Sequence, residues 1–187
     1  MHKLSPISPL GSDTARIDRI GDLTISEVTD QALASITARK DQETALRAAL
    51  GSAHGMTLPD VGTSSDSGGI SVFWTGPAQW MISAPHDRHE LLARDLKQVV
   101  GAAASVVEQT DGWCRFDVTG PTLCDLFERL SNAPVRNMTT GRVIRGTLEH
   151  LGVFLWRRAE DHMAVLGPRS SAASLHHALI SAAHSIA

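Results

Sequence analysis

The chain has 187 residues, a length that suits one large domain or two small halves with a shared core. Hydrophobic residues make up 42% and charged residues 20%, as in ordinary globular proteins, so the composition argues against extensive disorder. The net charge of −3 and the pI near 6.3 exclude the basic surface that binds nucleic acid.

The N-terminal segment, residues 1–24, is predicted to form an irregular arm because it is rich in Ser, Pro, Gly and Asp. It lacks the apolar core of a secretory signal, and no apolar run approaches the roughly 20 residues that span a bilayer. The two cysteines, Cys114 and Cys124, lack CxxC spacing, and one falls in a predicted strand and the other in a predicted helix. We therefore expect reduced, buried thiols in a cytoplasmic protein.

Residues 25–110 are predicted to form a first α+β half. Its expected elements run strand, helix, strand, strand, helix, strand, at residues 32–39, 41–50, 70–75, 79–84, 86–100 and 104–110. Gly76-Pro77-Ala78 separates two short apolar runs, which indicates a hairpin. Residues 51–69 are rich in Gly, Ser and Asp, and we expect them to form a mobile loop.

Residues 111–187 are predicted to repeat this order with one extra hairpin strand. The expected elements are strand, helix, three strands and helix, at residues 113–119, 121–130, 142–150, 153–158, 162–167 and 170–187. The first strand alternates between two faces with a period of two, Trp113, Arg115, Asp117 and Thr119 against Cys114, Phe116 and Val118.

The hairpin and the following helix of the two halves match each other. "VFWTGPAQWMISAPHDRHELL" and "VFLWRRAEDHMAVLGPRSSAASL" each contain a strand with Trp, a turn, an apolar strand, a break with Pro and a helix. The predicted fold class is therefore α+β, with two ferredoxin-like βαββαβ-type halves packed into one compact unit.

Motifs for known chemistry are absent from the sequence. It contains no GxGxxG after a strand, no GxxxxGK[ST], no HExxH and no GxSxG. The histidine pairs His86/His89 and His176/His177 lack further ligands at recognisable spacing, so we expect solvated histidines rather than a metal site. Cys114 faces inward and suits an inert thiol. We predict no catalytic, cofactor-binding or metal-binding residue in this chain.

Four residues are candidates for a partner interface: Trp74, Trp80, Arg157 and Arg158. Two interpretations stay open for the tryptophans. Either both fill the core, or one lies on a rim that a partner covers. The arginine pair either clamps a carboxylate of a partner or forms a solvated edge that discourages pairing between sheets.

Several short segments, taken in order, follow one family pattern. "LPDVGTSSDSGGISVFWTGPAQWMIS" has a Leu-Pro, an apolar strand and Trp-x-Gly-Pro-x-x-Trp, and "VVEQTDGWCRFDVTGPTLCDLFERL", "LGVFLWRR" and "VLGPRSSAASLHHAL" come after it. Over about residues 25–185 the chain thereby resembles the gamma subunit of bacterial heterotetrameric sarcosine oxidase. It departs from the family at "APVRNMTTG" (133–141), where members commonly carry Pro-Leu-Asp-Leu.

The resemblance implies a fold like the folate-binding aminomethyltransferase domain and a structural subunit without an active site of its own. The assembled enzyme oxidatively demethylates sarcosine to glycine and makes hydrogen peroxide. Its FAD, FMN, NAD and tetrahydrofolate sites belong to the larger subunits and its zinc to the smallest, so the implied partners are the alpha, beta and delta subunits. The alternative is a stand-alone folate-binding or aminomethyl-transfer domain, for which Glu108 and Asp111 are the candidate carboxylates.

Overall fold

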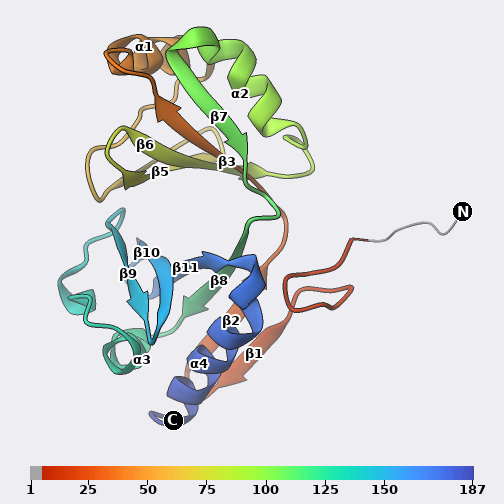
Figure 1. Ribbon diagram of the computed structural model, residues 1–187. Coiled ribbons are helices and arrows are strands. Elements are labelled where there is room, and N and C mark those ends of the chain that lie inside the picture. The colour runs from red at the N-terminus through yellow and green to blue at the C-terminus, as the bar shows by residue number, and fades with distance from the viewer. Residues whose placement is uncertain (1–5) are drawn as a thin grey trace, which may run out of the picture. The chain divides into compact units, whose positions relative to one another are not determined.

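The computed structural model describes residues 6–187 and divides the chain into two compact units (Figure 1). The middle unit is Asp30–Asp111. The terminal unit combines the N-terminal segment up to Thr29 with Gly112–Ala187, so the chain passes from one unit to the other twice. Residues 1–5 of the expected N-terminal arm lie outside the described residues.

The middle unit carries one antiparallel sheet with two helices on one of its faces (Figure 1). Its elements are β3 (Gln31–Ala38), α1 (Glu43–His54), β4 (Ser64–Ser67), β5 (Ile70–Gly76), β6 (Gln79–Pro85), α2 (Leu92–Val100), a 3-10 turn η1 (Gly101–Ala103) and β7 (Ala104–Glu108). The strand order is β4-β5-β6-β3-β7. Gly55 ends α1 in the left-handed conformation with φ of 62°, a backbone shape that glycine adopts without strain.

The terminal unit carries a second antiparallel sheet and two helices. Its elements are β1 (Ile17–Ile20), β2 (Leu23–Val28), β8 (Trp113–Thr119), α3 (Leu123–Leu130), η2 (Val135–Asn137), β9 (Val143–Leu148), β10 (Leu151–Ala159), β11 (His162–Pro168), η3 (Arg169–Ser171) and α4 (Ala172–His184). The strand order is β1-β2-β8-β11-β10-β9. With two antiparallel sheets and four α-helices in residues 6–187, the predicted α+β class is confirmed.

The two sheets share one order of elements once β1 is set aside. In the middle unit a central strand, β3, lies between the hairpin β5–β6 and the outer strand β7. In the terminal unit the central strand is β8, the hairpin is β10–β11, and the outer position is taken by β2. The strand that completes the terminal sheet therefore comes from before the middle unit in the chain, whereas β7 follows its own helix α2.

The expectation of an irregular arm over residues 1–24 needs correction, because β1 and the start of β2 lie within it. β2 pairs antiparallel with β8, from Thr24 opposite Thr119 to Val28 opposite Arg115. Leu23 and Ile25 are 2% and 1% exposed, so the strand contributes to the core of the terminal unit. The sequence analysis missed this pairing because the partner strand lies about ninety residues later in the chain, beyond the range of any local pattern.

A buried carboxylate anchors the loop that precedes β1. Glu27 is 4% exposed, and its two oxygens accept hydrogen bonds from the backbone N–H groups of Leu10 (2.9 Å) and Arg16 (3.0 Å). Arg169 Nη2 donates to the carbonyl oxygen of Ile7 at 2.8 Å. Because buried carboxylates need such partners, the loop satisfies the charge of Glu27, and Glu27 in turn holds the loop in place.

Two other expectations need correction in detail. Residues 86–91 form a turn and α2 begins only at Leu92, so His86 and His89 precede the helix. The stretch 51–69, expected as a mobile loop, contains the end of α1 and the strand β4. Between these elements the backbone is bonded by side chains, because Trp80 Nε1 donates to the carbonyl of Pro59 at 2.9 Å and Arg47 Nη1 donates to that of Leu58.

Gly120, which follows β8, gives a direct test of the contact between the β1–β2 turn and this position. Its φ is +137°, and a Cβ placed there would lie 2.3 Å from the carbonyl oxygen of Asp22. We expect Gly120→Ala to lower the free energy of unfolding, measured by urea denaturation, by about 2–4 kcal/mol, because the backbone at Asp22 would have to move away from the new Cβ. The control Gly11→Ala, at φ +83° with no atom within 4 Å of its Cβ, should cost about 1–2 kcal/mol from strain alone. Equal losses would show that the Asp22 contact is absent.

Candidate functional site

The two tryptophans of "WTGPAQW" lie on one face of the middle sheet, the face that packs on the helices. Trp74 and Trp80 are cross-strand partners in β5 and β6. Trp80 is 2% exposed, and the guanidinium carbon of Arg47 on α1 lies 5.4 Å from its ring centroid. This burial favours the interpretation of Trp80 as a core residue, and its place at a partner interface stays a prediction. Trp74 is only half-buried and stays accessible in part.

Arg157 and Arg158 make contacts on opposite sides of β10, Arg157 with Cys124 of α3 and Arg158 with Trp156, although the strand register shifts between Arg157 and Ala159. Arg157 pairs with the core residue Met163 of β11 and is 6% exposed. Arg158 is half-buried, and its guanidinium carbon lies 3.9 Å from the ring centroid of Trp156. The burial of Arg157 does not fit a solvated edge, whereas a contact of either arginine with a partner stays a prediction.

Three charged or polar side chains of the terminal unit meet on the sheet face to which the alternation of residues 113–119 assigned Arg115 and Asp117. Arg115 donates from Nε to Asp117 Oδ1 at 2.7 Å and from Nη2 to Asp117 Oδ2 at 2.8 Å. His162 Nε2 lies 2.9 Å from Asp117 Oδ2. We call Arg115, Asp117 and His162 the Asp117 cluster. The alternation of strand 113–119 is confirmed by its burial, in which every second residue is buried.

Electrostatics hold Asp117 in its ionised form. Burial alone would raise the pKa of Asp117, but the hydrogen bonds and charges of His162 and Arg115 outweigh burial, so the net pKa lies below its ordinary value. Both carboxylate oxygens are occupied by these partners. A carboxylate in this state is a poor general base, because taking a proton would break the contacts that stabilise its charge.

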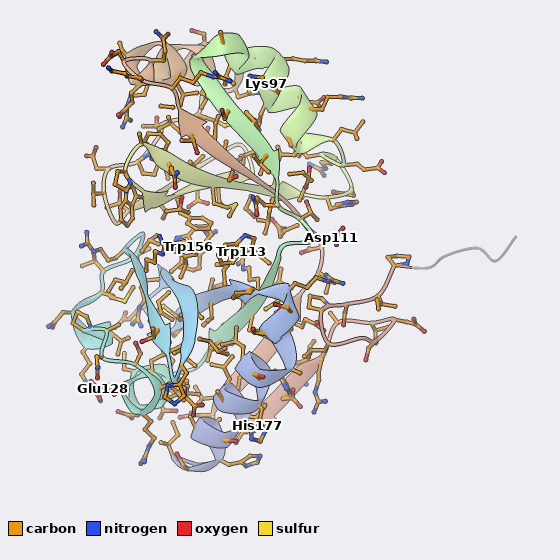
Figure 2. The ribbon with its side chains drawn as sticks, in the orientation of Figure 1. Lys97, Asp111, Trp113, Glu128, Trp156 and His177 are labelled. Atoms are coloured by element: carbon orange, nitrogen blue, oxygen red, sulfur yellow. The ribbon has the colours of Figure 1, made fainter. Side chains whose placement is uncertain are left out.

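Two tryptophans of the terminal unit are Trp113 and Trp156, both labelled in Figure 2, and Trp156 contacts the Asp117 cluster. Trp156 of β10 is 1% exposed and has the guanidinium carbon of Arg115 at 5.6 Å from its ring centroid. Trp113 of β8 packs on Phe154 with ring centroids 5.4 Å apart. The strand alternation predicts Arg115 and Asp117 on one face, but it carries no signal for His162 and Trp156, which join them only through the pairing of β11 with β8 and β10.

The histidines do not form a metal site in the described part of the chain. No group of three His, Cys, Asp or Glu side chains within residues 6–187 could hold a metal ion. His176 on α4 is not a solvated histidine, since its Nε2 lies 2.7 Å from Asp18 Oδ2 and its side chain is 12% exposed. Arg16 bonds the same carboxylate and, with His176, holds the pKa of Asp18 below its ordinary value despite partial burial. This arrangement fastens β1 to α4.

A cavity of about 240 Å³ lies in the terminal unit between the β1–β2 turn and the end of α4, lined by Ile20, Asp22, Leu23, Thr122, Ala183 and Ile186 among others. Its two polar side chains bond each other, because the Thr122 hydroxyl donates to Asp22 Oδ1. The cavity therefore offers mainly apolar surface.

No helix of the described residues has the length and apolar character needed to cross a membrane.

The comparison with solved structures gives a match over most of the chain. A chain of the heterotetrameric sarcosine oxidase from Corynebacterium sp. U-96, in complex with pyrrole 2-carboxylate, superposes with a TM-score of 0.76 and 25% sequence identity. The match covers 86% of this chain and 83% of that chain. This chain is structurally similar to a component of heterotetrameric sarcosine oxidase. The resemblance to that enzyme drawn from the sequence is thereby confirmed.

The aminomethyltransferase T of the glycine cleavage system from Bartonella henselae shares the fold, with a TM-score of 0.64 and 14% identity over 82% of this chain. The present chain matches only 44% of that protein, so it spans less than half of the transferase. The implied aminomethyltransferase-like fold is confirmed. No protein-family model matches the chain, and no curated protein matches it in sequence.

Proposed function

We propose that this chain is the gamma-type, non-catalytic structural subunit of a heterotetrameric oxidase that demethylates sarcosine to glycine. The observation that carries the proposal is the reciprocal match to the sarcosine oxidase component, which covers most of both chains. A catalytic domain embedded in a large subunit would leave most of the larger chain unmatched, as the transferase does. The matched component is instead about as long as this chain.

The chemistry of the terminal unit supports a structural role. The carboxylate of Asp117 is already paired with Arg115 and His162, and the carboxylate of Asp18 is paired with Arg16 and His176. Under this proposal the flavins FAD and FMN, NAD and zinc are held by the alpha, beta and delta subunits of a cytoplasmic complex. We interpret each unit as a ferredoxin-like βαββαβ half, in line with the order of strands and helices that the two sheets share.

Trp74 and Arg158 are the remaining candidates for partner contacts under this proposal. Each is half-buried within its own unit, and each is already oriented, Trp74 by its cross-strand partner Trp80 and Arg158 by stacking on Trp156. Aromatic and arginine side chains held in this way are typical anchors of protein interfaces.

Mild affinity purification of the tagged chain from its source organism tests the proposal. We expect a yellow eluate that contains two larger chains and one smaller chain and that oxidises sarcosine with release of hydrogen peroxide. Arg158→Ala should reduce the recovery of the larger chains, whereas Arg94→Ala, an exposed arginine of α2 beside Asp95, should not. A colourless eluate with this chain alone would overturn the proposal, and calorimetry with tetrahydrofolate would then test the folate-binding alternative.

A further inference from the structure

Cys124 lies at the start of α3 beside a buried positive charge. It is the second residue of the helix and is half-buried. Its Sγ lies 3.6 Å from Arg157 Nη1, which reaches it from β10. The hydroxyl of Thr122 bonds Asp22 and does not cap the helix, so the positive end of the helix dipole at Cys124 is not offset by a capping side chain.

Arg157 has an incomplete set of partners for a buried cation. Its Nη2 donates to the carbonyl oxygen of Glu160, while its Nε is buried without a hydrogen-bond acceptor. Within residues 6–187 no carboxylate forms an ion pair with it, and the nearby Asp125 pairs with Arg136 instead. Buried charges in proteins are normally paired, so the space around Arg157 favours an added negative charge.

The backbone of Arg157 is held by two hydrogen bonds of its own residue. The N–H of Arg157 donates to the carbonyl of Arg142 at 2.9 Å, and its carbonyl accepts from the N–H of Gly141 at 2.8 Å. The guanidinium itself is oriented by Nη2, which donates to the carbonyl of Glu160, and by Nη1, which lies 3.6 Å from the sulfur of Cys124. A cation and a helix N-terminus at one sulfur form the electropositive surroundings that characterise reactive cysteines.

Cys114 provides the contrast within the same unit. It is 1% exposed, its Sγ lies 3.4 Å from the carbonyl oxygen of Gly167, and burial raises the pKa of its thiol to about 11. A thiol in this state reacts slowly with electrophiles. The chain thus holds two cysteines, of which Cys124 is half-buried and faces a cation, and Cys114 is enclosed.

We propose that Cys124 is a modification site, a thiol that hydroperoxides oxidise and whose oxidised form pairs with Arg157. The thiolate sulfur attacks one peroxide oxygen, the new S–O bond gives a sulfenic acid, and the O–O bond breaks with its electron pair leaving on hydroxide. Sulfur loses two electrons and the peroxide gains them. Two equivalents of a small thiol reverse the reaction, releasing water and a disulfide of the small thiol. The inference does not depend on the proposed function.

The test treats the full-length chain with hydrogen peroxide in the presence of dimedone, which traps sulfenic acids, and locates the adducts by peptide mass spectrometry. A guanidinium and a helix N-terminus face the sulfur of Cys124, whereas the thiol of glutathione has no such neighbours, so we expect Cys124 to react roughly tenfold faster than glutathione. Cys114 should remain unlabelled, and Cys124→Ser should remove the adduct.

Arg157→Met, with its fold checked by circular dichroism, should slow labelling of Cys124 several-fold while leaving the labelling of glutathione unchanged. Equal labelling of the two cysteines, a Cys124 rate no faster than that of glutathione, or a folded Arg157→Met chain with an unchanged rate would each overturn the proposal. If Arg157→Met fails to fold, the comparison of wild-type Cys124 with glutathione and with Cys114 decides alone.

Discussion

Replacing Trp80 with alanine is expected to lower the free energy of unfolding of the middle unit by about 3–5 kcal/mol, the usual cost of removing a buried large aromatic side chain. The side chain is 2% exposed and packs in the core cluster beneath α1. Its loss also removes the hydrogen bond from Nε1 to the Pro59 carbonyl, which fixes the segment between α1 and β4. Arg47 would lose the ring on which its guanidinium lies.

Hydrogen exchange read by mass spectrometry is the suitable measurement, because it reports the middle unit separately from the terminal unit. Amides of β3 and β6 should exchange faster in Trp80→Ala, while those of β8 and β11 should not change. Trp80→Phe keeps most of the packing and should cost clearly less. Trp74→Ala is the matched control on the same sheet face, and a loss as large as that of Trp80→Ala would contradict the assignment of Trp80 alone to the core.

This result would also separate the two interpretations of "WTGPAQW". Replacing a core residue lowers the stability of the chain, and it lowers partner binding only as a consequence of that lost stability. If the Trp80→Ala chain kept its stability but failed to recover partner chains, Trp80 would be an interface residue despite its burial. The structure favours the first outcome, because the cross-strand pair presents Trp80 to the helices and leaves only Trp74 partly exposed.

Local patterns predicted most of the elements but not the pairings between distant segments. The alternation of residues 113–119 predicted which side chains of β8 are buried, since a strand has one dominant period. The same alternation could not show that β2 completes the terminal sheet or that His162 lies beside Asp117. Both depend on pairing between residues far apart in the chain, and such pairing leaves no local signal.

Arg157 shows why the candidate site was harder to predict than the fold. Judged by residue type alone, two adjacent arginines indicate a charged surface. Their contacts place them on opposite sides of β10, and whether the inward one is tolerated depends on what it meets there. Here it meets the carbonyl of Glu160 and the sulfur of Cys124, a residue thirty-three positions earlier on a helix. Sequence alone offered no reason to connect these two residues.

Asp117→Asn is expected to destabilise the terminal unit by about 3 kcal/mol near neutral pH. The substitution keeps the size of the side chain but removes the negative charge, and it leaves Arg115, whose side chain is 14% exposed, without its ionic partner. Removing one member of a buried ion pair costs more than the pair itself contributes, because the remaining charge stays desolvated. Asp95→Asn, in the exposed pair with Arg94, is the control and should cost less than about 1 kcal/mol.

The pH dependence of the same variant provides the sharper test. Because the folded-state pKa of Asp117 lies below its unfolded value of about 3.9, its contribution is complete above that pH and is lost as the pH falls through the folded-state pKa. The difference in unfolding free energy between wild type and Asp117→Asn, measured in urea from pH 7 to pH 3, should therefore be constant at first and shrink below about pH 4. Asp18 adds its own acid-sensitive contribution to both proteins, so it cancels in this difference. A difference that stayed constant down to pH 3, or that was absent at pH 7, would show that Arg115 and His162 do not stabilise the charge of Asp117.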